Sequence, residues 1–197
     1  MGVARRPEDA LFFVGSLFSD EMIFDVALDD LKVVFGPVLF LSSAYPWDVS
    51  DYYQKELGSP LMRRFVFFSD VVDPAGLVRA KHAVSSIEGR LSCEGKRRIN
   101  LDPGYITLAK VVLASWKNYS HRICLGSGVY AELELFCENA CFQSLPYTYR
   151  DYRDISCIQM FNSARSRLKK ILKAREERSS PERDSSTPDH PGENPLP

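Results

Sequence analysis

The chain has 197 residues, of which 45% are hydrophobic and 26% are charged, and its formal net charge at pH 7 is −1. A chain of this length and composition can bury a core of its own, so we expect one main domain. The small net charge excludes a strong overall field for nucleic acid or an anionic membrane, so neither is an expected partner. The sequence has no signal-like start and no apolar run near the roughly 20 residues of a membrane helix, which predicts a cytoplasmic protein.

Strands and helices alternate in the first half of the predicted structure. The elements expected there are a strand at 10–18, a helix at 20–35, strands at 38–41 and 64–69, a helix that begins at Asp73-Pro74, and a strand at 96–101. Apolar runs indicate the strands, and apolar residues at helical spacing indicate the helices. The order strand, helix, strand, strand, helix, strand is typical of the ferredoxin-like arrangement, an antiparallel sheet with helices on one face. We therefore predict an α+β fold with a ferredoxin-like start.

Further antiparallel strands and a C-terminal helix are expected in the second half. The segment Asn100–Tyr105 contains Pro and Gly and predicts a turn, and the apolar segment Ala109–Ser115 predicts a strand. A helical repeat of apolar residues predicts a last helix from about Asp154 to Arg178. Residues 1–9 would then be an N-terminal arm and residues 10–178 the domain. The segment 179–197 is rich in Ser, Pro, Asp and Glu, which predicts a disordered tail.

A β-hairpin is predicted between Ser120 and Leu135. Its apolar residues are all odd-numbered, so a three-residue loop, Gly126-Ser127-Gly128, would keep both apolar sets on one face. This register would pair Leu125 with Val129, Cys124 with Tyr130, and Arg122 with Glu132. It would also place His121 on the apolar face of the hairpin, opposite Leu133.

Several short motifs together resemble a known family. They are Asp51-Tyr52-Tyr53, Glu56-Leu57-Gly58, Asn100–Tyr105, Leu113-Ala114-Ser115, Lys117–Ile123, Tyr130-Ala131-Glu132, Leu145–Tyr149 and Asp151-Tyr152. With these motifs, residues 10 to 172 resemble a family of uncharacterised bacterial proteins described as a domain of unknown function. Some of its members carry the loose label "GTP-binding protein". The resemblance implies no established reaction or cofactor, and Trp116 and Tyr147 depart from its pattern, which tends to have Thr and Trp there.

A conventional GTPase mechanism is not expected. A P-loop needs the pattern Gly-x-x-x-x-Gly-Lys-Ser/Thr between a strand and a helix, so that backbone N–H groups surround the phosphates. The first strand-to-helix turn, Gly15–Asp20, has one glycine and no lysine, and the sequence contains no Asn-Lys-x-Asp motif.

The polar residues of the hairpin region have a functional and a structural interpretation each. Arg122 with Glu132 could orient the carboxylate or phosphate of a ligand, or form a cross-strand ion pair. His121 could be a general base, or a histidine hydrogen-bonded inside the core. Asp102 could belong to a turn, or converge with Lys117, His121 and Arg122 on one site. Asp102, His121 and Glu132 are metal-ligand types without a diagnostic spacing, so no metal site is predicted.

Aromatic segments and a basic helix are the other candidates. Tyr45–Tyr53 and Tyr147–Tyr152, with Thr148 between the later tyrosines, could line a pocket for a planar ligand or cover the edge of the sheet. The basic residues between Arg165 and Arg178 could contact RNA, but their spacing on the last helix favours a solvated face.

We predict a binder of a small anionic ligand, with a nucleotide as one candidate. The predicted ligand-binding residues are Lys117, Arg122, Glu132, Tyr52, Tyr147 and Thr148. A version with hydrolytic activity would use His121 or Asp102 for proton transfer. The alternative is a non-catalytic module for protein–protein interaction that docks through the aromatic segments and the basic helix. The sequence leaves the cofactor and the oligomeric state open.

Overall fold

The computed structural model describes residues 2–50 and 52–179. Its elements are β1 (Ala10–Phe18), α1 (Glu21–Phe35), β2 (Val38–Leu41), β3 (Tyr45–Pro46), α2 (Gln54–Leu57), β4 (Met62–Val72), the 3₁₀ helix η1 (Pro74–Gly76), α3 (Leu77–Arg90), β5 (Ile99–Ile106), β6 (Lys110–Ser115), β7 (Ile123–Gly126), β8 (Val129–Glu138), β9 (Cys141–Ser144), the 3₁₀ helix η2 (Arg150–Arg153) and α4 (Ile155–Ser179). Asp51 and, apart from Ser179, the predicted tail lie outside the described residues. None of the described helices is long and apolar enough to cross a membrane.

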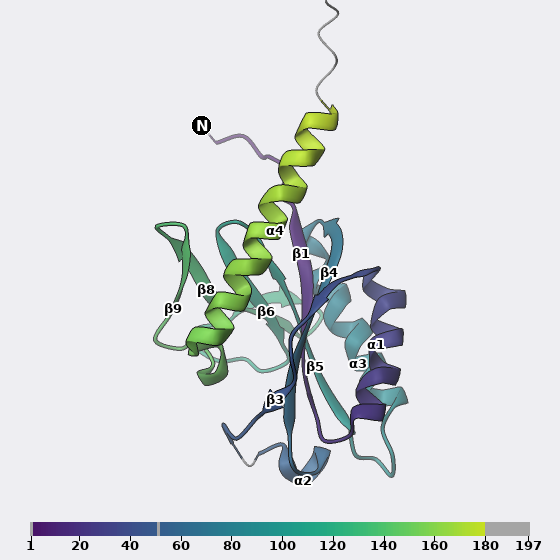
Figure 1. The fold of residues 1–197 in the computed structure, drawn as a ribbon. Helices are drawn as coiled ribbons and strands as arrows, with labels where there is room; N and C mark the ends of the chain where they lie inside the picture. Colours follow the sequence, from purple (N-terminus) through teal and green to yellow (C-terminus); the bar gives the residue numbers. More distant parts are fainter. Residues whose placement is uncertain (1, 51, 180–197) are drawn as a thin grey trace, which may run out of the picture.

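Strands of the described chain form one nine-stranded antiparallel sheet (Figure 1). The order across it is β2-β4-β1-β5-β6-β8-β7, and β3 and β9 add to β4 and β8. β1 lies between β4 and β5, and all of its residues are buried, as the apolar run predicted. The expected mixed α and β composition, the extension of the sheet by antiparallel strands and the C-terminal helix are confirmed.

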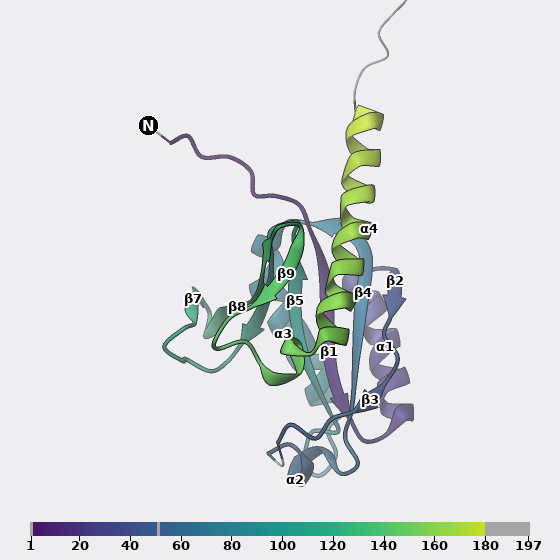
Figure 2. The same ribbon diagram turned by 60° about the vertical axis from the view of Figure 1, so that its left-hand side comes forward.

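Helices cover both faces of the sheet. α1 and α3 pack on one face, where Phe24 and Val84 contribute to a core with Val14 and Phe68. α4 crosses the other face, as Figures 1 and 2 show, and its Phe161 packs on the phenylalanines of β1 and β4. Apolar residues on both faces of the central strands therefore build two cores, one under each helical layer.

The turn predicted at Asn100–Tyr105 is wrong, because this segment belongs to strand β5. The two residues that suggested a turn have other roles. Pro103 pairs with Val14 of β1, and the pairing of β5 with β6 begins at the next residue, Gly104. A Cβ atom on Gly104 would overlap the ring of Phe13 and lie 2.5 Å from the carbonyl oxygen of Val112, so glycine is needed there for close packing.

The predicted hairpin forms, but part of its register is wrong. Cys124 pairs with Tyr130 as expected. Gly126 then pairs with Val129, so the loop has two residues, and Leu125 is the extra residue of a bulge rather than the partner of Val129. Ile123 is 71% exposed, because β7 is the last strand of the sheet and lies away from α4 (Figure 2). The odd-numbered residues of β7 therefore do not line the core.

Candidate functional site

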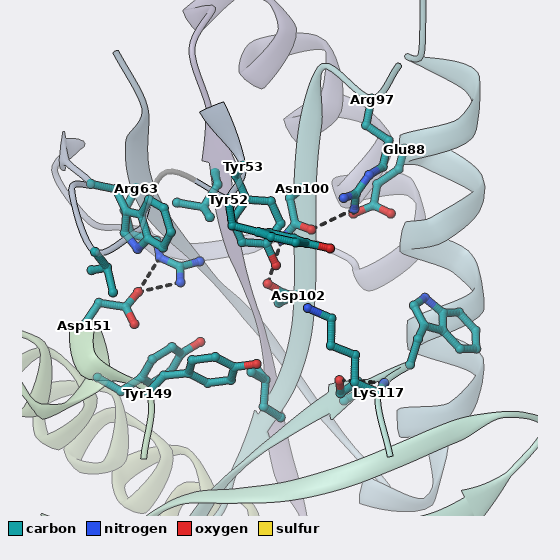
Figure 3. A pocket seen from close by; sticks show the side chains of 18 of the residues that line it. Tyr52, Tyr53, Arg63, Glu88, Arg97, Asn100, Asp102, Lys117, Tyr149 and Asp151 are labelled. Carbon is teal, nitrogen blue, oxygen red and sulfur yellow. Dashed lines mark hydrogen bonds and ion pairs between the residues drawn. The ribbon is translucent and has the colours of Figure 1, made fainter. Parts of the chain in front are cut away.

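A cavity of about 300 Å³ lies at the end of the sheet where β1 ends and β5 begins (Figure 3). Its floor consists of side chains from β4, β5 and β6. Trp47, Val49 and the tyrosines before α2 form one wall, and η2 with the residue before it forms another. Trp116 and Lys117, which follow β6, form its rim.

The alternation of side chains along the strands explains why polar groups gather here. Arg63 shares a face of β4 with Phe65 and Phe67, which pack under α4. On β5, Asp102 shares that face with Ile106, which is also part of this core. Along this face, the two phenylalanines and Ile106 are apolar and belong to the core. Arg63 and Asp102, nearer the start of each strand, are charged and line the cavity.

Arg63 and Asp151 form a buried ion pair at the inner wall. Nε of Arg63 donates to Oδ2 of Asp151 at 2.8 Å, Nη2 donates to the same oxygen, and the side chains are 6% and 4% exposed. Burial opposes the charge of Arg63, but Asp151 and more distant acidic groups raise the pKa of Arg63 above its ordinary value. Nη1 of Arg63 and the hydroxyl of Tyr152 are buried without a hydrogen-bond partner among the described residues. The two N–H groups of Arg63 Nη1 therefore remain available as donors.

A second polar group surrounds Asp102 on the floor. Its carboxylate accepts a hydrogen bond from Lys81 Nζ at 3.2 Å and one from Asn100 Nδ2 at 2.7 Å. Burial would raise the pKa of Asp102, but Lys81, Arg63 and these hydrogen bonds hold it below its ordinary value. Asp102 is therefore ionised at neutral pH. Arg97 donates to Asn100 Oδ1 at 2.8 Å and so joins this group (Figure 3).

Glu88 of α3 is the remaining carboxylate in the lining. Its Oε1 accepts the backbone N–H of Leu101 at 2.6 Å. Burial raises the pKa of Glu88 to about 7, although the Leu101 N–H, Lys81 and Arg97 favour its charged form. Glu88 therefore exchanges a proton near neutral pH, as a general acid or base does.

Lys117 differs from the other cations of the lining. Its ammonium nitrogen lies 4.8 Å from the centre of the Tyr52 ring, and Figure 3 shows it reaching over the cavity from the rim. Within residues 2–50 and 52–179 no carboxylate lies within ion-pair distance of it. Lys117 and Tyr52 are both exposed, so a ligand can reach them.

Arg122 lies behind the rim and all of its contacts are with the protein. Its guanidinium binds Glu132 Oε2 at 2.7 and 2.8 Å, Ser115 Oγ at 2.7 Å, the carbonyl oxygen of Lys117 at 3.0 Å and the hydroxyl of Tyr149 at 2.7 Å. Its side chain is 1% exposed. Arg122 therefore fixes the positions of Lys117 and Tyr149, and it is not among the residues that line the cavity.

The other predicted residues outside the lining also bond to the protein. His121 does not lie on the apolar face: its Nε2 lies 2.7 Å from Glu132 Oε1, and its ring stacks on Tyr147 at 4.7 Å. Thr148 donates to the carbonyl oxygen of Glu134 and accepts the N–H of Leu145, which fixes the turn before η2. Of the predicted residues, Lys117, Tyr52 and Asp102 line the cavity, whereas Arg122, Glu132, His121, Tyr147 and Thr148 do not.

Sequence reasoning missed Arg63, Lys81, Arg97 and Glu88 as lining residues. A signal existed for Arg63, because alternation along its strand puts it on the same face as Phe65 and Phe67. A charged residue that alternation directs inward needs a partner or a function. The helical position of Glu88, one residue after the buried Ile87, gave no comparable signal.

Comparison with known proteins identifies a family. The family model described as "Domain of unknown function (DUF4416)" matches residues 8–168, which confirms the resemblance seen in the sequence. Neither the curated proteins nor the solved structures contain a match to this chain.

Proposed function

We propose that this chain, which belongs to the DUF4416 family, binds a small anionic ligand in the cavity between β4, β5 and η2. The proposal rests on two cationic side chains whose interactions with the described residues are incomplete. Lys117 has no carboxylate partner among the described residues, and the buried Nη1 of Arg63 has no acceptor among them. An anion in the cavity would interact with both groups.

The aromatic wall supports a ligand that also has an apolar or planar part. Tyr52 and Tyr53 lie at the centre of the view in Figure 3, and Trp47 packs edge-on against Tyr53 at 5.7 Å. Rings of this kind hold a flat ligand by stacking and by burying its apolar surface. A nucleotide is one candidate, and an apolar carboxylic acid is another.

A hydrolytic version of the site would use a carboxyl group of the lining. Asp102 lies in the cavity, but its lowered pKa makes it a weak base, and because it is ionised it has no proton to donate at neutral pH. His121, the other predicted group, bonds to Glu132 behind the rim. Glu88, with its pKa of about 7, is better suited to donate and accept a proton at neutral pH.

The proposal also includes the ferredoxin-like arrangement, the bacterial origin and the cytoplasmic location that the sequence predicts. The order β2-β4-β1-β5, with α1 and α3 on one face, supports the ferredoxin-like interpretation of these four strands. We propose a bacterial, cytoplasmic protein, in line with the resemblance and with the composition.

A thermal-shift screen tests the proposal. The chain is heated with inorganic phosphate, pyrophosphate, acetate, benzoate or AMP, because a ligand that binds the folded state raises the melting temperature. The variant Lys117→Met should lose the shift, whereas Lys110→Met, an exposed lysine at the other end of β6, should keep it. If no anion changes the melting temperature, or if both variants respond alike, the proposal is wrong.

The alternative, a protein–protein interaction module, has one observation in its favour. Exposed apolar side chains gather near the rim and β7: Trp116, Tyr119 and Ile123 are 41%, 50% and 71% exposed. A patch of this kind is typical of an interaction surface. Substitution of Ile123 and Tyr119 by Ser would then weaken partner binding without affecting the anion shift.

A further inference from the structure

We infer that the ligand is a small monoanion with one or two rings, and that its anionic group is a carboxylate rather than a phosphate. This inference rests on the proposed function, because it names the ligand class of the same cavity. Three properties of the lining carry it: the balance of charge, the number of free donors, and the volume.

Among the described residues, the charges around the cavity nearly cancel. The cation–carboxylate pairs are Arg63 with Asp151, Lys81 with Asp102 at 3.2 Å, and Arg97 with Glu56 at 2.7 Å. Arg97 also lies 3.6 Å from Glu88. Lys117 alone among the lining cations lacks such a partner in the part of the chain that the structure describes. One negative charge on the ligand therefore balances the site when Glu88 is protonated. A second charge would lie unpaired near Asp102 and Asp151, which is costly away from water.

The free donors at the inner wall suit the two oxygens of a carboxylate. Asp151 already binds Nε and Nη2 of Arg63, so Nη1 is the donor that remains. The hydroxyl of Tyr152 lies nearby, since both atoms are 3.2 Å from the position that a Cβ atom on Gly15 would take.

Both of these atoms are shielded from water, so a ligand oxygen reaches them only after the surrounding side chains shift. The protein has already paid the desolvation cost of these donors, so an acceptor that reaches them restores a missing hydrogen bond. A phosphate group carries up to two charges. With one unpaired lysine among the described cations of the lining, the second of these charges would have no partner.

The volume limits the rest of the ligand. About 300 Å³ is at the lower end of the roughly 300–1,000 Å³ of pockets for drug-sized molecules. One or two rings fill such a space, and the ring of Tyr52, held under Lys117, offers a surface for stacking. A nucleoside triphosphate is too large and too highly charged for it.

Titration calorimetry compares matched probes at about pH 6.5, which lies below the Glu88 pKa of about 7. The probes are benzoate, indole-3-carboxylate, phenyl phosphate, inorganic phosphate and the neutral benzamide. We expect the two carboxylates to bind and phenyl phosphate to bind about tenfold more weakly or not at all. Lys117→Met should weaken carboxylate binding by about fivefold, the upper range for a partly exposed charge pair. Lys110→Met should leave it unchanged. Lys117 is exposed, so its variant should fold, which an unchanged melting temperature would verify.

Each other outcome is informative. Tighter binding of phenyl phosphate than of benzoate, lost in Lys117→Met, would overturn the carboxylate assignment and leave the proposed function standing. Carboxylate binding that ignores Lys117, or binding of benzamide equal to that of benzoate, would overturn the inference as well. If none of the anions binds, inorganic phosphate included, the proposed function fails together with the inference.

Discussion

Arg122 donates a hydrogen bond of 2.7 Å from Nη2 to the hydroxyl of Tyr149, which connects the start of the hairpin to the segment before η2. The same guanidinium binds Ser115 and the backbone of Lys117. One buried side chain therefore ties together two sides of the cavity, although it does not line the cavity itself. This arrangement separates the groups that would contact a ligand from the group that positions them.

The first prediction concerns Arg122. Arg122→Ala leaves the carboxylate of Glu132, which is 1% exposed, without its main partner. Removing one member of a buried pair typically costs about 3–5 kcal/mol, so we expect the free energy of unfolding to fall by about that amount. Urea denaturation measures it. Arg150→Ala, which removes an exposed arginine of η2, is the control and should change stability by less than about 0.5 kcal/mol. Equal effects of the two substitutions would contradict the structural role of Arg122.

The second prediction concerns the closest backbone approach in β5. Gly104→Ala places a methyl group against the Phe13 ring and 2.5 Å from the Val112 carbonyl oxygen, so we expect destabilisation of about 2 kcal/mol or more. Gly89→Ala on α3 is the matched comparison, since nothing lies within 4 Å of its Cβ position. Alanine there should stabilise the helix by about 0.5–1 kcal/mol. A denaturant midpoint of Gly104→Ala that equals or exceeds that of the original chain would show that Gly104 is not required.

The third prediction concerns the pH dependence of stability through Glu134. Burial, together with the neighbouring Glu132, raises the pKa of Glu134 from 4.5 to about 9. The folded state therefore holds this proton while the unfolded state has released it, so stability falls as the pH rises from about 4.5 to about 9. Glu134→Gln should remove this part of the decline, and its advantage over the original chain should grow from pH 5 to pH 9.

Urea midpoints at pH 5, 7 and 9 measure this effect. Glu138→Gln, which changes an exposed glutamate of the same strand, is the control and should follow the unsubstituted chain at every pH. An advantage of Glu134→Gln that is constant or shrinks with rising pH would mean that Glu134 is ionised in the folded protein.

The fourth prediction concerns the pH dependence of ligand binding. Glu88 faces Lys81, Asp102, Arg97 and the Leu101 N–H, and burial raises its pKa to about 7. Its ionisation adds a negative charge to the cavity, so benzoate affinity should fall by about threefold between pH 6 and pH 8, within the range for partly screened charges. Glu88→Gln keeps an acceptor for the N–H of Leu101 and should make the affinity nearly constant over this range. A decline of equal size in the variant would assign the titration to another group.

Local patterns in the sequence determined the elements of the fold. The apolar run at 10–18, the helical repeats before Gly36 and after Pro74, and the long apolar stripe of α4 each describe how one segment meets its core. The prediction of a turn at Asn100–Tyr105 was wrong because proline and glycine usually mark turns between elements. Here Gly104 is required by the approach of Phe13 and Val112, which no local pattern reveals.

For the site, too, the sequence determined one part and the tertiary structure determined the other. Residue types in the sequence predicted Lys117, Tyr52 and Asp102, which line the cavity, but also Arg122 and Glu132, whose bonding capacity is used by the protein. Only the tertiary structure brought Arg63 to Asp151, 88 positions away in the chain, and left its Nη1 without a partner among the described residues. The physical reason is that burial and pairing decide whether a charged side chain is free to act, and both depend on contacts between segments that are distant in the sequence.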